Sequence, residues 1–222
     1  MPPRIKLVTF DALHTLITPR LPIAVQYAQT FEPYLGPLDP KLLNLSFKRA
    51  LKDLQKSKPL YASPSPSPSP SGTSEPSSQN ASPDPTSWWT EIIRRTALGA
   101  HASPALVSQH LQSIVPVLMK RFSSDEGYML FDDVVPSLQE LKRMGVKTGI
   151  ITNADSRIRD PEQEQPLILV SELLGIEKPS PRIFELACTL AGVKLEEGLH
   201  VGDEVDACVY LSLIVPARTL CG

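Results

Sequence analysis

Polar side chains that could act on an anionic substrate follow three short hydrophobic runs of this sequence. Asp11 follows LVTF, Thr152 and Asn153 close the run GIITN, and Asp203 follows HVG. Lys178 lies between the second run and the third, in the segment EKPSPRIF. One carboxylate can act as a nucleophile and a second can help to bind a divalent cation, while a hydroxyl and an ammonium offset negative charge on the substrate. These residue types therefore suit metal-assisted chemistry on an anionic group.

The elements around these side chains predict that they meet. The hydrophobic runs indicate buried strands at residues 5–10, 146–153 and 199–204. Amphipathic patterns indicate helices at 134–144, where Gly145 follows as a stop signal, and at 183–191. Strands that alternate with helices favour an α/β fold with a mostly parallel, doubly wound sheet. Because such sheets bind ligands beyond the carboxyl ends of their strands, we expect the polar side chains to gather at that edge.

A helical block separates the first strand from the others. Apolar residues recur at spacings of three and four between residues 21 and 56, which is typical of helices. We expect Ser87 to cap a helix that carries Trp88 and Trp89, and Ser103 to cap another that starts at Pro104 and ends near residue 122. The block predicts a helical insertion at 18–125 within a core formed by 1–17 and 126–222. Within it, packing of the tryptophan pair is favoured over stacking on a substrate.

Residues 62–87 are rich in Ser and Pro and nearly lack apolar side chains. Such a segment cannot bury enough apolar surface to offset its ordering entropy, so we expect it to be disordered or extended. A tolerated surface insertion is the favoured interpretation, and a regulatory tract phosphorylated at its Ser-Pro pairs is the alternative. The glycosylation sequon at Asn80 is expected to be idle, because no secretion signal is apparent.

Composition narrows the classes of function. The chain has 222 residues, 41% of them hydrophobic, and a formal net charge of −2. The near balance of charge argues against nucleic acid or an anionic membrane as partner, and no apolar run is long enough to span a bilayer. Three cysteines without CxxC spacing argue against a disulfide framework or a zinc site. We expect an intracellular protein, cytoplasmic or nuclear, that is a monomer or a weak homo-oligomer.

Taken together and in this order, the motifs resemble the four motifs of the haloacid dehalogenase-like superfamily. FDALHTL resembles the first, IITN the second, EKPSPRIF the third and HVGDEVD the fourth. The helical block lies where subfamily I carries a C1 cap, and DALHTL with the tryptophan pair is most similar to the branch of haloacid dehalogenase-like hydrolase domain-containing protein 3. The resemblance implies a Rossmann-like α/β core with an inserted helical cap. It also implies a Mg²⁺-dependent hydrolase that acts on a small phosphorylated molecule through an aspartyl intermediate.

The resemblance also implies a role for each matched residue. Asp11 would be the nucleophile, and Thr152 and Lys178 would bind the transferred group. Asn153 would contact the substrate. The metal site would hold Mg²⁺ between Asp11, the backbone carbonyl of Leu13 and Asp203.

The first motif departs from the phosphatase pattern at Leu13, where the family's phosphatases carry a second Asp as general acid and base. Leucine cannot transfer a proton, and such catalysis is worth about 10²- to 10⁴-fold in rate. We therefore expect any phosphatase activity to be slow, unless His14 supplies the proton. Haloacid dehalogenases carry a non-acid here and need no metal, so a dehalogenase-like activity stays open. A non-catalytic relative that binds a ligand or protein partner through the cap cleft is the other alternative.

Two segments depart from the family in ways that concern folding. Between Asn153 and Lys178 the family has a helix and a short strand, but here a run of Pro and charged residues should break any helix. After Asp203 the chain lacks a helical signature, and we expect the sheet edge beyond it to be uncovered. An altered gene model or splice form, with an incomplete C-terminal part, would explain both.

Overall fold

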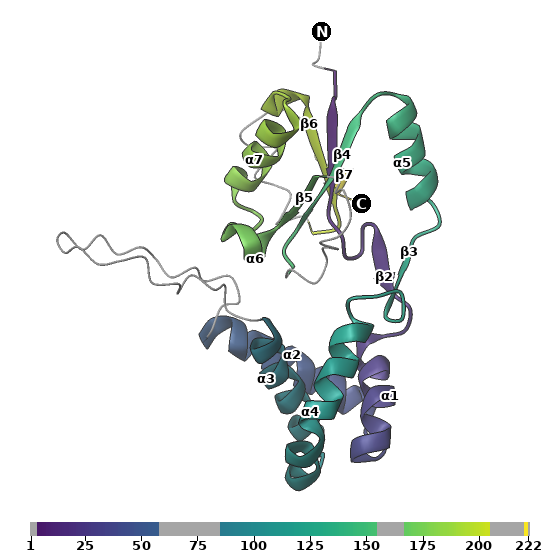
Figure 1. The fold of residues 1–222 in the computed structure, drawn as a ribbon, viewed down its shortest axis with the longest axis vertical. Helices are drawn as coiled ribbons and strands as arrows, with labels where there is room; N and C mark the ends of the chain where they lie inside the picture. Colours follow the sequence, from purple (N-terminus) through teal and green to yellow (C-terminus); the bar gives the residue numbers. More distant parts are fainter. Residues whose placement is uncertain (1–3, 58–84, 155–166, 205–219, 222) are drawn as a thin grey trace, which may run out of the picture. The chain divides into compact units, whose positions relative to one another are not determined.

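The computed structural model describes residues 4–57, 85–154, 167–204 and 220–221 (Figure 1). Its contacts divide the chain into two compact units. One comprises Met1–Arg20 and Ser123–Gly222 and contains the sheet, while the other comprises Leu21–Phe122 and is helical. The first unit is therefore built from two separate stretches of sequence, with the second inserted between them.

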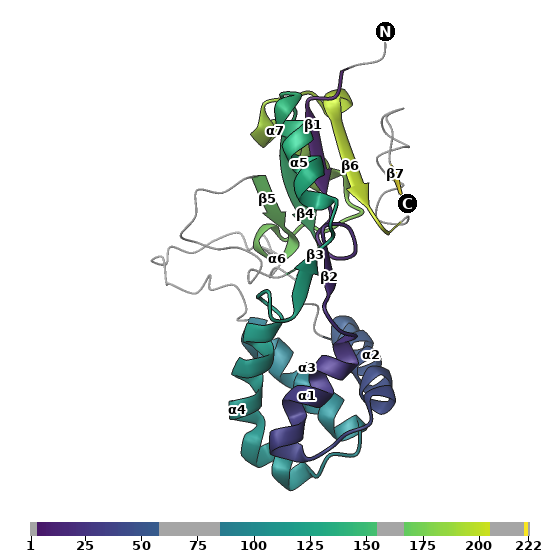
Figure 2. The same ribbon diagram turned by 90° about the vertical axis from the view of Figure 1, so that its right-hand side faces the viewer.

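The α/β unit contains a five-stranded sheet in the order β5-β4-β1-β6-β7, in which every neighbouring pair is parallel. The strands are β1 (Leu7–Phe10), β4 (Lys147–Thr152), β5 (Leu167–Val170), β6 (Gly198–Gly202) and β7 (Leu220–Cys221). Strand β1 is central, and β4 and β6 flank it (Figure 2). The predicted α/β class with a mostly parallel sheet is confirmed.

Helices α5 (Val134–Arg143), α6 (Ser171–Leu174) and α7 (Pro181–Ala191) connect the strands, and a short 3-10 helix at Leu195–Glu197 precedes β6. Helix α5 ends where predicted: Gly145 adopts a φ of 72°, which a glycine reaches without steric cost. One face of α7 packs on the sheet, where Ile183 and Phe184 lie against Leu7 and Ile151. This packing forms the core of the unit, and burial there raises the pKa of the Cys188 thiol.

One expectation for this unit was wrong, and another falls mainly outside the described residues. Between Asn153 and Lys178 the apolar run LILV forms strand β5, which pairs in parallel with β4. The run of Pro and charged residues that should break a helix lies mostly in residues 155–166, outside the described residues. The edge beyond β6 is not left uncovered, since β7 pairs with β6 at Val201 and Gly202. Even a two-residue strand supplies backbone partners to an edge that would otherwise present free N–H and C=O groups.

A second, two-stranded sheet was not predicted from the sequence. In it β2 (Ile17–Pro19) pairs in antiparallel fashion with β3 (Tyr128–Leu130). The two strands stand at the chain's exit from the α/β unit and at its return to that unit. They therefore close the unit around the insertion.

The helical unit consists of α1 (Ile23–Leu35), α2 (Pro40–Ser57), α3 (Pro85–Gly99) and α4 (Pro104–Arg121). Helices α1 and α2 take the place of the one helical stretch predicted at residues 21–56. The chain breaks between them because Gly36 takes a φ of 78° after α1 and Pro37 follows it. Their apolar faces meet those of α3 and α4 in one core. Its most buried large side chains are Phe31, Leu43, Ile93, Ile114 and Leu118.

Two details of the helical unit differ from the prediction. Helix α3 begins at Pro85, so Ser87 lies inside the helix and does not cap it, and residues 85–87 do not belong to a disordered tract. The physical reason is that proline fits the first turn of a helix, where its missing N–H has no partner to lose. Ser103 does precede α4 at the N-cap with Pro104 next, yet its side chain makes no capping hydrogen bond. Residues 62–84 of the tract lie outside the described residues.

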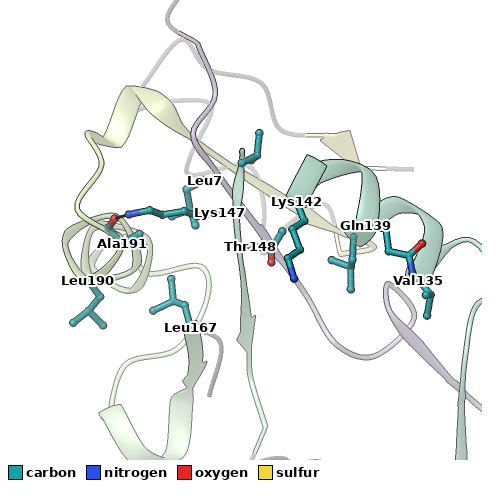
Figure 3. A pocket seen from close by; sticks show the side chains of 11 residues that line it. Leu7, Val135, Gln139, Lys142, Lys147, Thr148, Leu167, Leu190 and Ala191 are labelled. Atoms are coloured by element: carbon teal, nitrogen blue, oxygen red, sulfur yellow. Dashed lines mark hydrogen bonds between the residues drawn. The ribbon is translucent and has the colours of Figure 1, made fainter. Parts of the chain in front are cut away.

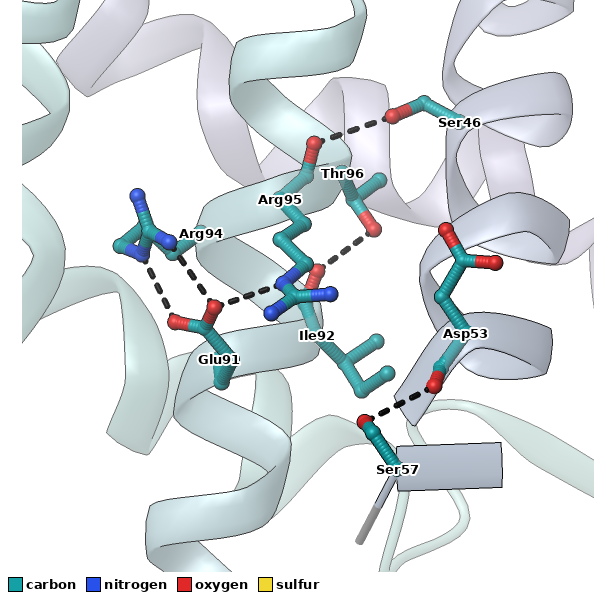
Figure 4. Close-up of polar contacts among 8 residues, drawn as sticks. All are labelled: Ser46, Asp53, Ser57, Glu91, Ile92, Arg94, Arg95 and Thr96. Atoms are coloured by element: carbon teal, nitrogen blue, oxygen red, sulfur yellow. Dashed lines mark hydrogen bonds and ion pairs between the residues drawn. The ribbon is translucent and has the colours of Figure 1, made fainter. Parts of the chain in front are cut away.

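Polar contacts along α3 are shown in Figure 4. The Glu91 carboxylate pairs with Arg94 at 2.7 Å and with Arg95 at 2.6 Å. The hydrogen bonds from Arg94, the largest cause, hold the pKa of Glu91 at about 2. Ser46 of α2 donates to the Arg95 carbonyl, which ties the two helices together.

The tryptophan pair of α3 packs within the helical unit. The rings of Trp88 and Trp89 meet edge to face, with centroids 5.1 Å apart. Both lie against a small cluster made by Ala50 and Leu54 of α2 and Ile92 of α3. This contact agrees with a packing role for the pair.

None of the described helices has the length and apolar character that crossing a membrane requires.

Candidate functional site

The register of the sheet brings the predicted site residues to its carboxyl edge. Phe10 at the end of β1 is paired with Val201 of β6 and with Ile150 of β4. The next residue, Asp11, donates its N–H to the Val201 carbonyl at 2.8 Å. Thr152 ends β4 at the same edge, and Asp203 follows β6 directly.

Asp11 and Lys178 form the central contact of the site. The Lys178 ammonium lies 2.6 Å from Asp11 Oδ2, and the two side chains are only 2% and 13% exposed. The other carboxylate oxygen, Oδ1, accepts the Ala12 N–H at 2.7 Å. A buried ion pair of this kind loses much of its attraction to desolvation, so it contributes little to stability, and removing one partner would leave an uncompensated buried charge.

Asn153 holds the backbone of Lys178 from both sides. Its Oδ1 accepts the Lys178 N–H at 2.8 Å, and its Nδ2 donates to the Lys178 carbonyl at 2.9 Å. The hydroxyl oxygen of Ser171, which is fully buried, lies 2.9 Å from both Asn153 Oδ1 and the Thr152 carbonyl, and its single proton can go to either acceptor. The three residues form a clamp that fixes where the Lys178 side chain starts.

The clamp adds a role that the sequence did not indicate. Asn153 is predicted to contact substrate, and in this structure its amide engages the backbone of Lys178. Ser171 was missed, because a serine at the start of a short helix usually reads only as a cap. Thr152 is buried to 4% exposure, and its carbonyl lies within hydrogen-bond distance of the Ser171 hydroxyl.

The turn after Asp11 is closed by backbone hydrogen bonds. The Ala12 carbonyl accepts from Leu16 at 2.9 Å and from Ile17 at 3.0 Å. Within the turn, Leu13 is 37% exposed, and the exposed His14 adopts a φ of 59°, a left-handed conformation that histidine tolerates better than most residues. The turn therefore offers no carboxylate after Asp11, and the His14 imidazole is the nearest titratable group along the chain.

The donor set suits a hard cation that takes its remaining ligands from water and substrate. Asp11 and Asp203 supply carboxylates at adjacent strand ends, and the turn supplies the Leu13 carbonyl. In the part of the chain that the structure describes, no three His, Cys, Asp or Glu side chains gather into a metal cluster. Mg²⁺ commonly uses one or two protein carboxylates together with water and substrate oxygens, so the residues present fit that ion.

A second buried layer lies one step back along the strands. Thr9 and His200 are paired across β1 and β6, and Thr9 Oγ1 lies 3.0 Å from His200 Nδ1. The imidazole is 1% exposed and meets the Phe184 ring edge to face. Burial, the largest cause, and the Lys178 charge lower the pKa of His200 to about 3. Sequence reasoning missed this residue, because it sits inside a strand and not at its end.

A hollow of about 610 Å³ lies at the opposite, amino edge of the sheet (Figure 3). Lys147 and Thr148 at the start of β4 border it, together with Val135 and Lys142 of α5 and Leu190 of α7. None of the predicted site residues lines it.

The match to known proteins is broad. A family model described as a haloacid dehalogenase-like hydrolase matches residues 5–206. Haloacid dehalogenase-like hydrolase domain-containing protein 3 of Bos taurus is 28% identical over 206 residues, which span 90% of this chain and 74% of that protein. Glyceraldehyde 3-phosphate phosphatase of Methanopyrus kandleri is 33% identical over 123 residues, 52% of this chain and 49% of that protein.

Solved structures agree on the fold. The 2-haloacid dehalogenase from Pseudomonas syringae pv. Tomato DC3000 superposes with a TM-score of 0.57 at 22% identity, over 98% of this chain and 86% of that one. At this identity the likeness concerns the fold alone. With the family model spanning both halves of the α/β unit and the site edge, the chain belongs to the haloacid dehalogenase-like hydrolase family, in the branch of domain-containing protein 3.

Proposed function

We propose that this chain is a Mg²⁺-dependent hydrolase that acts on a small phosphorylated molecule, with Asp11 as nucleophile. The observation that carries the proposal is the buried contact of 2.6 Å between Asp11 and Lys178 at the ligand-binding edge of a parallel sheet. A lysine fixed beside a carboxylate offsets the negative charge that would otherwise repel an incoming phosphate from Asp11.

In the first step an Asp11 carboxylate oxygen attacks phosphorus, and the bond to the leaving oxygen breaks, which leaves an aspartyl-phosphate on Asp11. Lys178 binds the transferred group, with its backbone held by Asn153 and its ammonium beside the reacting carboxylate. Thr152 would donate a hydrogen bond to the same group. Bound between Asp11, Asp203 and the Leu13 carbonyl, Mg²⁺ would supply charge neutralisation for the phosphoryl oxygens.

Proton transfer is the weak point of this site. The leaving oxygen must gain a proton, and water must lose one when it attacks the aspartyl-phosphate. Leu13 cannot do either, so we expect turnover reduced by about 10²- to 10⁴-fold relative to a site with a general acid. The aspartyl-phosphate should accumulate if its hydrolysis is the slower step.

The same apolar residue keeps a second candidate open, a dehalogenase-like activity in which Asp11 displaces halide from a small haloacid. That reaction needs neither a proton for its leaving group nor a metal. Leu13 and its 37% exposed side chain are compatible with it.

The deciding experiment uses the purified full chain and a panel of phosphate esters that includes triose phosphates, with Mg²⁺ or with EDTA. We expect slow, Mg²⁺-dependent phosphate release that Asp11→Asn abolishes, because an amide is not a competent nucleophile here. Haloacids assayed for halide release without metal test the second candidate. Release of neither product by the folded chain, or turnover that survives Asp11→Asn, would reject the proposal and favour a relative that only binds.

A further inference from the structure

The buried hydrogen bond between Thr9 and His200 can run in either direction, and the nearby Leu199 carbonyl favours one of them. Thr9 has one hydroxyl proton, and its oxygen lies 3.2 Å from the Leu199 carbonyl, which can only accept. The same oxygen lies 3.0 Å from His200 Nδ1. If the Thr9 proton goes to Leu199, Thr9 must accept from His200, so the imidazole carries its proton on Nδ1.

The other ring nitrogen is then a bare acceptor in the core. His200 Nε2 is buried and has no hydrogen-bond partner among the residues that the structure describes. Burial lowers the pKa of the ring, which keeps it neutral and leaves a lone pair on Nε2. An unsatisfied buried acceptor is costly, so a donor within reach should be drawn to it.

Lys178 is the donor that lies close enough to act on this ring. Its charge contributes to the lowered pKa of His200. Its ammonium nitrogen, like His200 Nε2, is buried and has no hydrogen-bond partner among the residues that the structure describes. Within the described residues the ammonium makes one ion pair, with Asp11 Oδ2. An ammonium has three protons, so it can donate to further acceptors. A second acceptor close to the Lys178 ammonium would therefore give one of its remaining protons a hydrogen-bond partner.

We propose that one buried water donates to His200 Nε2 and accepts from the Lys178 ammonium, and so positions that ammonium beside Asp11. Its use in turnover rests on the proposed function, whereas the hydrogen bond itself does not. A neutral acceptor holds the ammonium without cancelling its charge, in contrast to a carboxylate. Lys178 therefore keeps positive charge for an incoming anion.

The hydrogen bond can be tested without any enzymatic assay. The chain has four histidines, so ¹⁵N-histidine NMR gives few imidazole signals, and loss of one set in His200→Gln assigns them. We expect the His200 ring protonated on Nδ1, with Nε2 shifted as a hydrogen-bonded acceptor. Lys178→Met should move Nε2 towards the position of a free acceptor, and Thr9→Val should mainly move Nδ1.

A wild-type ring protonated on Nε2 would overturn the proposal, and so would an Nε2 signal that does not respond to Lys178→Met. The first of these needs no variant, so the test holds even if Lys178→Met fails to fold. Where turnover is measurable, His200→Leu should lower kcat about tenfold or more, and His200→Gln, which keeps an acceptor, should recover part of the loss. Equal losses in both would also count against the role. Absence of turnover in the wild type would reject the proposed function and leave the NMR result standing.

Discussion

His200 should make the stability of the α/β unit depend on pH between about 7 and 5. Its pKa is lowered from an ordinary 6.5 to about 3 in the folded chain, by burial first and by the Lys178 charge second. Below about pH 6.5 the unfolded chain therefore binds a proton that the folded chain does not. The free energy of unfolding falls as the pH drops from there, and this contribution stops growing near pH 3.

The size of the effect follows from one proton. Each pH unit below 6.5 costs about 1.4 kcal/mol of stability, so about 2 kcal/mol is lost between pH 7 and pH 5 from His200 alone. His200→Gln has no such group. We expect the variant to be less stable at pH 7 but to lose about 2 kcal/mol less than the wild type over the same interval, because the other groups contribute to both chains alike.

Urea unfolding at several pH values between 7 and 5 measures this difference. Circular dichroism is the suitable signal, since both tryptophans lie in α3 and their fluorescence reports on the helical unit. Comparing how steeply the free energy of unfolding changes with pH in the two chains cancels the change in absolute stability that the substitution causes. Parallel pH dependence in the two chains would mean that His200 gains its proton equally well when folded, and the account of its burial would be wrong.

Three further changes have expected outcomes. Leu13→Asp should raise phosphatase turnover by up to about 10²-fold and speed loss of the aspartyl-phosphate from Asp11, and a folded variant with no gain would place the defect elsewhere in the site. Gly149→Ala should lower the stability by about 1–3 kcal/mol in thermal unfolding, because its Cβ would lie 2.8 Å from the Leu167 carbonyl and 3.1 Å from the Leu167 Cβ. Deleting residues 62–84 should leave the melting temperature nearly unchanged, since the segment offers almost no apolar side chains; a large drop would show that it packs on a unit.

The parts of the fold that could be predicted depend on local signals. Strands β1, β4 and β6 are apolar runs that stop at a polar residue, and α5 and α7 carry an apolar stripe that ends before a glycine. Ser103 followed by Pro104 marked the start of α4 correctly. Each of these patterns is complete within a few residues, so no knowledge of distant partners is needed.

The parts that could not be predicted depend on partners far away in the sequence. The clamp on Lys178 joins residues 25 positions apart, and no spacing rule links an Asn to the backbone of a distant Lys. Strands β2 and β3 have three residues each and are defined only by pairing with one another across the helical insertion. His200 looked like an ordinary strand residue, because its importance comes from what surrounds it.

Leu13 argues against catalysis, whereas the buried pair of Asp11 and Lys178 argues for a site that binds an anion. The energetics of that pair favour the second interpretation. A buried ion pair such as Asp11–Lys178 is a poor way to stabilise a fold, since well-packed apolar residues of similar size are often at least as stable. Its position at the ligand edge, with Asn153 and Ser171 fixing the lysine, is better explained by a bound anion than by stability. Under the proposed function, Leu13 removes only proton transfer and leaves the proposed nucleophile Asp11 and the charge of Lys178 in place. We therefore expect a site that accepts a phosphoryl group on Asp11 and releases it slowly.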